Sequence, residues 1–227
     1  MLYELKQIKK LQKRPDGIFG SFMTRPVSHI VAYLSMKLGL SPNIVSFISL
    51  VLCSIASGII AIYTSYLWYV VAALIWWFAA IFDAADGDLA RYTKTASPFG
   101  GWFDSLLDRI KEFMIFALLG YISYKIYDNE IYLLLGVLSV FSNVMSGWIS
   151  DTKKLFIEKR EVEIYLGKKY SLGMVDTRDF VVIVSLLCNE LRLALIIYGL
   201  VFPFVVLSQI ILFYKRYGRS NNISKEN

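Results

Sequence analysis

Residues Leu67–Tyr124 read LWYVVAALIWWFAAIFDAADGDLARYTKTASPFGGWFDSLLDRIKEFMIFALLGYISY, which is two long apolar segments around a stretch rich in aspartate. The apolar segments approach or reach the roughly 17–25 residues that a helix needs to cross a bilayer. The aspartates stand where the first segment ends and the second begins. Ionisable groups at the end of a membrane span are costly to desolvate, so they are usually functional or paired. The stretch therefore predicts two membrane helices that meet at a functional site.

The whole chain has the composition of a membrane protein. Of its 227 residues, 56% are hydrophobic and 15% aromatic, more than a soluble core could cover. Hydropathy predicts six spans, at about Asn43–Thr64, Leu67–Phe82, Gly100–Tyr124, Ile131–Ile149, Arg178–Cys188 and Leu193–Tyr214. The fifth is too short to cross unaided, so either its helix begins earlier in the polar loop or the segment is re-entrant. We expect an all-α integral membrane protein with six transmembrane helices.

The segment before the first span has a different pattern. Residues Ile18–Leu38 mix large apolar side chains with basic and polar ones, which suits an amphipathic helix lying in the membrane interface. The chain then divides into a cytoplasmic arm with this helix (1–42), a six-helix catalytic domain (43–214) and a polar cytoplasmic tail (215–227).

The distribution of lysine and arginine predicts the orientation. With six spans, only Lys125 and Arg192 of the 24 basic residues lie in loops on the far side. The positive-inside rule then places both termini, and the aspartate-rich site, on the cytoplasmic side of the cell membrane. The formal net charge of +6 indicates attraction to anionic headgroups, and no nucleic-acid-binding motif accompanies it.

Helical spacing brings the aspartates together. Residues three or four apart share a face of a helix. On the extension of the second span these are Asp83, Asp86, Gly87, Ala90 and Arg91, and on the third span they are Gly100, Asp104 and Asp108. A short antiparallel connection turns the two faces toward each other. We therefore expect four carboxylates to converge at the cytoplasmic rim; a solvated cluster at two helix ends is the alternative.

Four converging carboxylates repel one another unless a cation neutralises them. Oxygen ligands without histidine or cysteine favour Mg²⁺, Mn²⁺ or Ca²⁺ over zinc. Two such ions clamp a pyrophosphate in phosphoryl transfer. The small residues Gly87, Ala90 and Gly100 leave room for a bulky ligand beside the backbone.

The same residues match a family signature. The spacing Asp83-x2-Asp86-Gly87-x2-Ala90-Arg91-x8-Gly100-x3-Asp104-x3-Asp108 resembles, without a mismatch, the pattern DxxDGxxARx8GxxxDxxxD of the CDP-alcohol phosphotransferases. The six spans and the interfacial arm resemble that family's architecture as well.

This resemblance implies a role for each matched residue. Asp83, Asp86 and Asp104 correspond to metal ligands, and Asp108 completes the cluster as the general base. Gly87, Ala90, Arg91 and Gly100 correspond to the nucleotide side of the site. The implied reaction uses Mg²⁺ or Mn²⁺, as two ions, to move a substituted phosphate from a CDP-alcohol to an acceptor hydroxyl with release of CMP. A homodimer is also expected from the family.

The residues around the motif are open to two readings. Arg109 either forms an ion pair with its neighbours or holds an acceptor phosphate, and Arg178 is the other candidate for that phosphate. Lys111 and Glu112 suit a mobile ion pair beyond the acids. Asp88 points away from the metal-binding face and is expected to be solvated.

The substrates are less constrained than the reaction. CDP-diacylglycerol or its ether counterpart, with inositol phosphate or glycerol phosphate as acceptor, makes a phospholipid. A CDP-inositol donor with an inositol phosphate acceptor makes di-myo-inositol phosphate phosphate. The runs Arg14–Gly17, Phe99–Arg109 and Thr177–Asp179 resemble members that handle inositol phosphates. A cation transporter is a remote alternative, because transport predicts acids near the midplane and paired halves, neither of which the sequence has.

Overall fold

The computed structural model describes residues 2–12, 16–17, 19–156, 165–166, 170–171 and 174–217, and these are mainly helical. The helices are α1 (Leu2–Lys10), α2 (Arg25–Lys37), α3 (Pro42–Ile62), α4 (Tyr66–Thr93), α5 (Pro98–Tyr127), α6 (Ile131–Phe156), α7 (Met174–Leu187), α8 (Leu191–Ile196) and α9 (Phe202–Tyr217), with π-helical turns η1 (Gly20–Thr24) and η2 (Ile197–Val201). Three two-residue strands, β1 (Asp16–Gly17), β2 (Tyr165–Leu166) and β3 (Tyr170–Ser171), form a small sheet in the order β1-β3-β2. This sheet is a minor departure from the all-α prediction.

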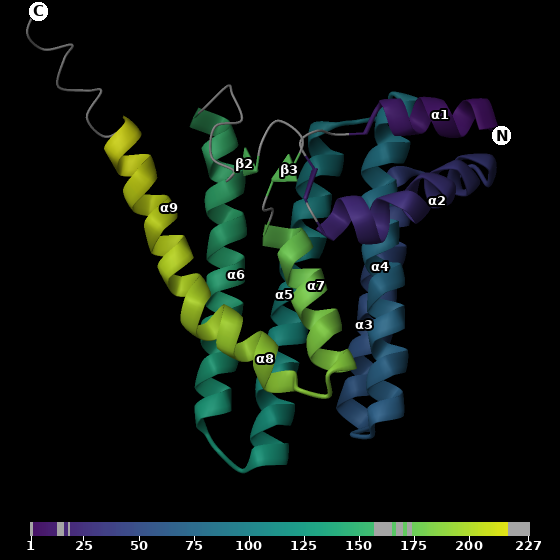
Figure 1. The fold of residues 1–227 in the computed structure, drawn as a ribbon. Helices are drawn as coiled ribbons and strands as arrows, with labels where there is room; N and C mark the ends of the chain where they lie inside the picture. Colours follow the sequence, from purple (N-terminus) through teal and green to yellow (C-terminus); the bar gives the residue numbers. More distant parts are fainter. Residues whose placement is uncertain are drawn as a thin grey trace, which may run out of the picture.

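Long helices run up and down side by side in one bundle (Figure 1). Because α8, η2 and α9 follow one another without a break, they act as one long segment from Leu191 to Tyr217. Helices α1 and α2 lie across one end of this bundle rather than along it (Figure 1). The tail residues 218–227 and Arg14 and Pro15 of the predicted inositol-phosphate run lie outside the described residues.

Within the described residues, four stretches are long and apolar enough to cross a membrane: Pro42–Ile62, Tyr66–Thr93, Ile131–Thr152 and Leu191–Lys215. They match the first, second, fourth and sixth predicted spans. Their outer faces carry exposed large apolar side chains, among them Phe47, Val137, Phe204 and Leu212. A soluble protein rarely exposes so much contiguous apolar surface, so this pattern indicates a membrane protein.

The third and fifth predicted spans differ from these four. Helix α5 has 30 residues, but charged residues occupy much of its first half. Helix α7 has 14 residues and is about 21 Å long at 1.5 Å per residue, short of the bilayer core. It begins at Met174, so the fifth helix starts earlier in the polar loop, which is one of the two forms expected for it.

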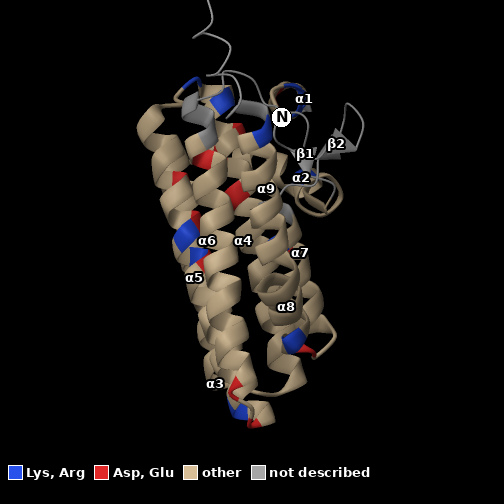
Figure 2. Ribbon diagram, turned by 90° about the vertical axis from the view of Figure 1, so that its left-hand side faces the viewer, with Lys and Arg blue, Asp and Glu red and all other residues tan. Residues whose placement is uncertain are grey.

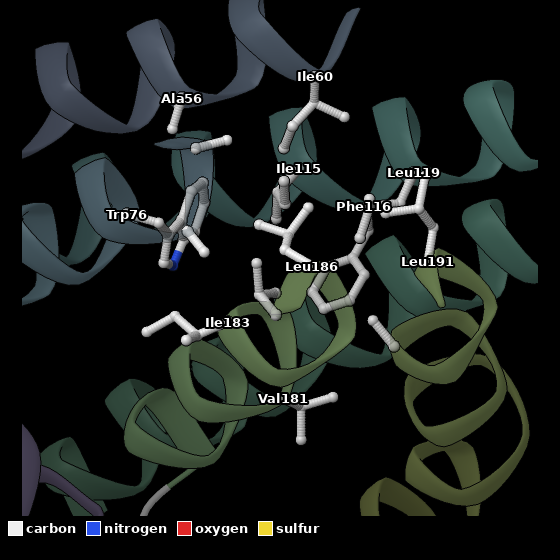
Figure 3. Packing of buried hydrophobic residues seen from close by; sticks show 14 of the residues in the cluster. Ala56, Ile60, Trp76, Ile115, Phe116, Leu119, Val181, Ile183, Leu186 and Leu191 are labelled. Carbon is white, nitrogen blue, oxygen red and sulfur yellow. The ribbon is translucent and has the colours of Figure 1, made fainter. Parts of the chain in front are cut away.

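The core lies among α3, α4, α5, α7 and α8 (Figure 3). Alanines on α3 and α4, such as Ala56 and Ala72, let these helices approach closely, and larger side chains fill the centre. Trp76 of α4, Phe116 of α5, and Ile183 and Leu186 of α7 all belong to this one buried cluster (Figure 3). A second cluster, which includes Ala32, Ala85 and Leu89, packs α2 against the last turns of α4. The core therefore packs α4 and α5 against α3, and it fixes α2 over α4.

Charges are unevenly spread along the bundle. Most of the acidic and basic residues gather in the half near α1 and α2, and a smaller group lies at the opposite end (Figure 2). The helices between these two groups are largely uncharged (Figure 2). The predicted site residues lie in the charged half, toward the end where α4 joins α5.

Candidate active site

Three aspartates meet between α4 and α5. One carboxylate oxygen from each of Asp83, Asp86 and Asp104 lies within 4.8 Å of the other two. Asp83 and Asp86 are three residues apart on α4 and share its face, and Asp104 comes from the second turn of α5. The predicted convergence is therefore observed for three of the four carboxylates.

A tight connection between the two helices produces this meeting. Helix α4 ends at Thr93, and its C-cap Lys94 adopts the left-handed conformation with φ of 57°. Ser97 then caps α5, its Oγ accepting a hydrogen bond from the backbone N–H of Gly100 at 3.0 Å, and Pro98 starts the helix. A Cβ on Gly100 would lie 3.3 Å from Ser97 Oγ and 3.4 Å from Asn43 Oδ1. Gly100 thus lets the start of α5 lie close to the start of α3.

Asp86 is buried and is held by a residue from another helix. The hydroxyl of Ser46, on α3, donates a hydrogen bond to Asp86 Oδ2. This contact joins residues forty apart in the chain. No motif in the sequence singles out Ser46, so sequence reasoning missed it.

The three carboxylates fit a divalent cation. Asp104 Oδ1 is buried and has no hydrogen-bond partner among the described residues. A buried carboxylate oxygen without a donor is costly unless a cation meets it. The donor set consists of oxygens alone, which is the set that hard cations such as Mg²⁺ and Mn²⁺ prefer.

Asp108 lies beside this group and contacts two cations. Lys111 Nζ is 3.0 Å from Asp108 Oδ1 and also forms an ion pair with Asp83 Oδ1. Arg178 Nη2 is 3.6 Å from the same Asp108 oxygen. The Lys111 side chain is only 2% exposed. Asp108 is therefore linked to the cluster through a buried lysine, and its service as a fourth metal ligand stays a prediction.

Lys111 was assigned by sequence to a mobile ion pair beyond the acids, and that assignment is wrong. It is buried among them because it follows Asp108 by three residues and so lies on the same face of α5. The i,i+3 spacing was the available signal. Lys111 also contacts Asp83, which lies on α4, and the spacing of residues along α5 cannot predict that contact.

Arg178 and Arg109 are both fixed by ion pairs. Arg178 is 1% exposed, and it donates to Glu112 Oε1 at 3.1 Å and to Asp179 Oδ1 at 3.0 Å. Arg109 pairs with Glu112 Oε2 at 2.9 Å and donates to the carbonyl of Asn143 on α6 at 3.2 Å. The ion-pair reading of Arg109 is thus observed. The binding of an acceptor phosphate by either arginine stays a prediction.

The other motif residues lie on α4 beyond Asp86. A Cβ added at Gly87 would lie 3.2 Å from Arg91 Nη1. Because glycine has no side chain, the Arg91 guanidinium can lie close to the backbone there. Ala90 is partly buried on the same stretch. Arg91 Nη2 donates a hydrogen bond of 2.6 Å to Asp88 Oδ1.

Asp88 is not solvated, and the expectation that it would be is wrong. Its exposure is 0%, and it pairs with Arg91 and with Arg25 of α2. Asp88 does point away from the metal-binding face, as its helical position requires. However, α2 covers that other face of α4, so the side chain enters a protein interface instead of water.

Comparison with known proteins agrees with this geometry. The sequence model of the family described as "CDP-alcohol phosphatidyltransferase" matches residues 39–208 of this chain. The chain is 25% identical over 188 residues to a "Bifunctional IPC transferase and DIPP synthase" of Archaeoglobus fulgidus, covering 82% of this chain and 36% of that protein. It is 26% identical over 191 residues to the protein of the same name from Thermococcus kodakarensis, covering 81% of this chain and 42% of that protein.

A third relative matches over fewer residues but with a higher identity. The chain is 38% identical over 77 residues to an "Archaetidylinositol phosphate synthase" of Pyrococcus horikoshii, covering 34% of this chain and 38% of that protein. The chain spans less than half the length of these curated relatives. Because the family match covers most of the chain, including the helices that carry the three-carboxylate cluster, this protein belongs to the CDP-alcohol phosphatidyltransferase family.

Proposed function

We propose that the chain transfers a substituted phosphate group from a CDP-alcohol to an acceptor alcohol and releases CMP, in phospholipid biosynthesis. The observation that carries this proposal is the meeting of Asp83, Asp86 and Asp104 within 4.8 Å, on a motif that resembles the family signature and lies inside the residues that the family model matches. CDP-diacylglycerol or an ether analogue is the proposed donor. Inositol phosphate or glycerol phosphate is the proposed acceptor.

The proposed cofactor is Mg²⁺ or Mn²⁺, with two ions in the working site. Asp83, Asp86 and Asp104 would hold metal, and Asp108 would complete the set. When bound, such ions neutralise charge on the donor's phosphates as the bond to CMP breaks. The unpartnered Asp104 Oδ1 supports this assignment from the protein side.

The chain's own residues supply positioning and a base. Asp108 would accept the proton of the acceptor hydroxyl. The hydroxyl oxygen would then form a bond to the donor phosphorus as the bond from phosphorus to CMP breaks and CMP departs. Gly87, Ala90, Arg91 and Gly100 would form the nucleotide side. Arg178 and Arg109, which lie beside Asp108 and Glu112, would bind an acceptor phosphate.

A second candidate differs only in its substrates. Two relatives are named "Bifunctional IPC transferase and DIPP synthase", and a third name contains inositol phosphate. The name of the first two relatives favours a CDP-inositol donor and an inositol phosphate acceptor, which would yield di-myo-inositol phosphate phosphate, whereas the third name, a lipid synthase, favours the first candidate. The same carboxylates and the same base would serve both reactions.

The proposed setting is the cell membrane, with six spans and with both termini and the site on the cytoplasmic side. Helices α5 and α7 would be the third and fifth spans, shielded by the four more apolar ones. Helix α2 would lie in the interface, as its crosswise position supports (Figure 1). The division into arm (1–42), catalytic domain (43–214) and tail (215–227), and a homodimer, belong to the same proposal.

The test is CMP release by the purified protein in detergent, with CDP-diacylglycerol, its ether analogue or CDP-inositol as donor. Each donor is combined with inositol phosphate or glycerol phosphate, with and without Mg²⁺ or Mn²⁺. We expect metal-dependent CMP release for one donor and acceptor pair, and none from the Asp104→Asn variant. If a folded protein releases no CMP from any pair, the proposed function is wrong.

A further inference from the structure

Asp88 joins the surface helix α2 to the motif on α4. Its Oδ2 accepts a hydrogen bond from Arg25 Nη1 at 3.0 Å and lies 3.4 Å from Ser28 Oγ. Its Oδ1 accepts from Arg91 Nη2 at 2.6 Å. The two oxygens of one fully buried carboxylate are thus divided between α2 and the motif arginine.

Arg25 makes a second contact that fixes this arrangement. The same Nη1 donates to the backbone carbonyl of Ala84, one turn before Asp88, at 3.0 Å. His29 Nε2, one turn further along α2, lies 3.7 Å from Asp88 Oδ2. The contacts around Asp88 therefore come from two successive turns of α2, so a displacement of this helix would move the carboxylate's partners together.

Arg91 is held on one side only. Its Nη2 is bonded to Asp88, while its Nε is buried and has no hydrogen-bond partner among the described residues. Gly87 leaves the space in which the guanidinium lies. The Arg91 guanidinium therefore has a buried N–H donor that no described residue occupies, and guanidinium donors suit an anionic ligand such as a phosphate.

We propose that Asp88 is a positioning residue that holds Arg91 in the orientation for binding the nucleotide phosphate, and that α2 is coupled to nucleotide binding through it. This inference rests on the proposed function, since it takes CMP as the ligand. Asp88 has no place among the fixed residues of the motif. Its role follows from its contacts in the structure.

The test measures the Kd of CMP in the presence of Mg²⁺ by titration calorimetry on the full-length protein in detergent. Asp88→Asn keeps the size of the side chain and removes its charge. We expect CMP to bind this variant about tenfold more weakly, the typical cost of losing one charge-assisted hydrogen bond. Asp128→Asn is the matched control, because Asp128 is exposed at the far end of α5. This variant should bind CMP as the wild type does.

A double-mutant comparison separates positioning from general destabilisation. In an Arg91→Ala background, Asp88→Asn should change the Kd of CMP no further, because the residue through which Asp88 acts is gone. Arg25→Met tests the α2 side of the link, and we expect it to weaken CMP binding in the wild type but not in Arg91→Ala. It also keeps the inference testable should Asp88→Asn not fold.

The outcomes are distinct for the two proposals. If the wild type does not bind CMP with Mg²⁺, the proposed function fails. If the wild type binds CMP and both variants bind it equally well, the coupling is refuted. Effects that add fully to that of Arg91→Ala likewise refute it, because they show a structural role that does not pass through Arg91.

Discussion

Lys111 Nζ lies 3.0 Å from Asp108 Oδ1 and at the same time forms an ion pair with Asp83, so one buried ammonium group joins the two acidic helices. Lys111 belongs to α5 and Asp83 to α4, 28 residues earlier in the chain. Charges taken out of water are stable only when they are paired, and removal of one partner leaves the other uncompensated. This lysine therefore compensates part of the negative charge of the site.

Replacement of Lys111 by methionine should destabilise the metal-free protein by roughly 3–5 kcal/mol, the usual cost of breaking a buried ion pair. The same variant should bind Mn²⁺ more tightly than the wild type, because the carboxylates then lack their internal cation. Thermal unfolding in detergent and Mn²⁺ titration measure the two effects. Lys125→Met, at the exposed far end of α5, is the control. Equal behaviour of the two variants would contradict a compensating role for Lys111.

Asp104→Asn tests the metal assignment without a turnover assay. The substitution preserves volume but removes the negative charge of the one cluster residue whose buried oxygen lacks a hydrogen-bond donor. We expect Mn²⁺ affinity to fall by about tenfold or more, as for the loss of a charge-assisted contact. Electron paramagnetic resonance of bound Mn²⁺ gives the affinity directly. Asp128→Asn makes the same chemical change away from the cluster and should leave Mn²⁺ binding unaltered; an equal loss in both would rule out Asp104 as a ligand.

Asp108→Asn tests the base, because Asp83, Asp86 and Asp104 remain in this variant to hold metal. Loss of a general base typically lowers kcat by about 10²–10⁴-fold. The Kd of CMP should remain near the wild-type value, because the proposed nucleotide side consists of other residues. Single-turnover CMP release and CMP titration measure these two quantities on the same preparation. A variant that retains the kcat of the wild type would show that another group accepts the proton.

Much of the site is predictable because its order is local. The spacing of Asp83 and Asp86 along one helix and of Asp104 along the next, with a short polar connection between them, is enough to bring three carboxylates together. Likewise, four of the six predicted spans have counterparts among the helices long and apolar enough to cross a membrane. Helical spacing determines the first feature, and the length and hydropathy of each segment determine the second.

The remainder depends on contacts between distant segments. Helical position correctly turns Asp88 away from the cluster, but only the fold shows that α2 covers it and supplies Arg25 from 63 residues earlier. Ser46 reaches Asp86 from α3 in the same way. Such partners have no spacing rule, so a sequence pattern predicts a solvated side chain where the structure has a buried ion pair.

The approach of α5 to α6 leads to the final prediction. A Cβ on Gly120 would lie 2.9 Å from the Cα of Gly136 and 3.0 Å from the carbonyl oxygen of Tyr132, both backbone atoms of α6. In a membrane, helices associate through close packing of small residues rather than through the hydrophobic effect. Gly120→Ala should therefore push the helices apart and lower stability by about 1–3 kcal/mol, the usual cost of overpacking.

Gly58→Ala is the matched control for Gly120→Ala. A Cβ at Gly58 of α3 meets nothing within 4 Å, so alanine there should be neutral or should stabilise by up to about 1 kcal/mol through its higher helix propensity. Thermal unfolding of both variants in the same detergent compares an overpacked helix contact with an open one. Equal unfolding temperatures would contradict the close contact of α5 and α6. A lower temperature for Gly120→Ala alone would show that the glycine pair sets their separation, and with it the support of the helix that carries Asp104 and Asp108.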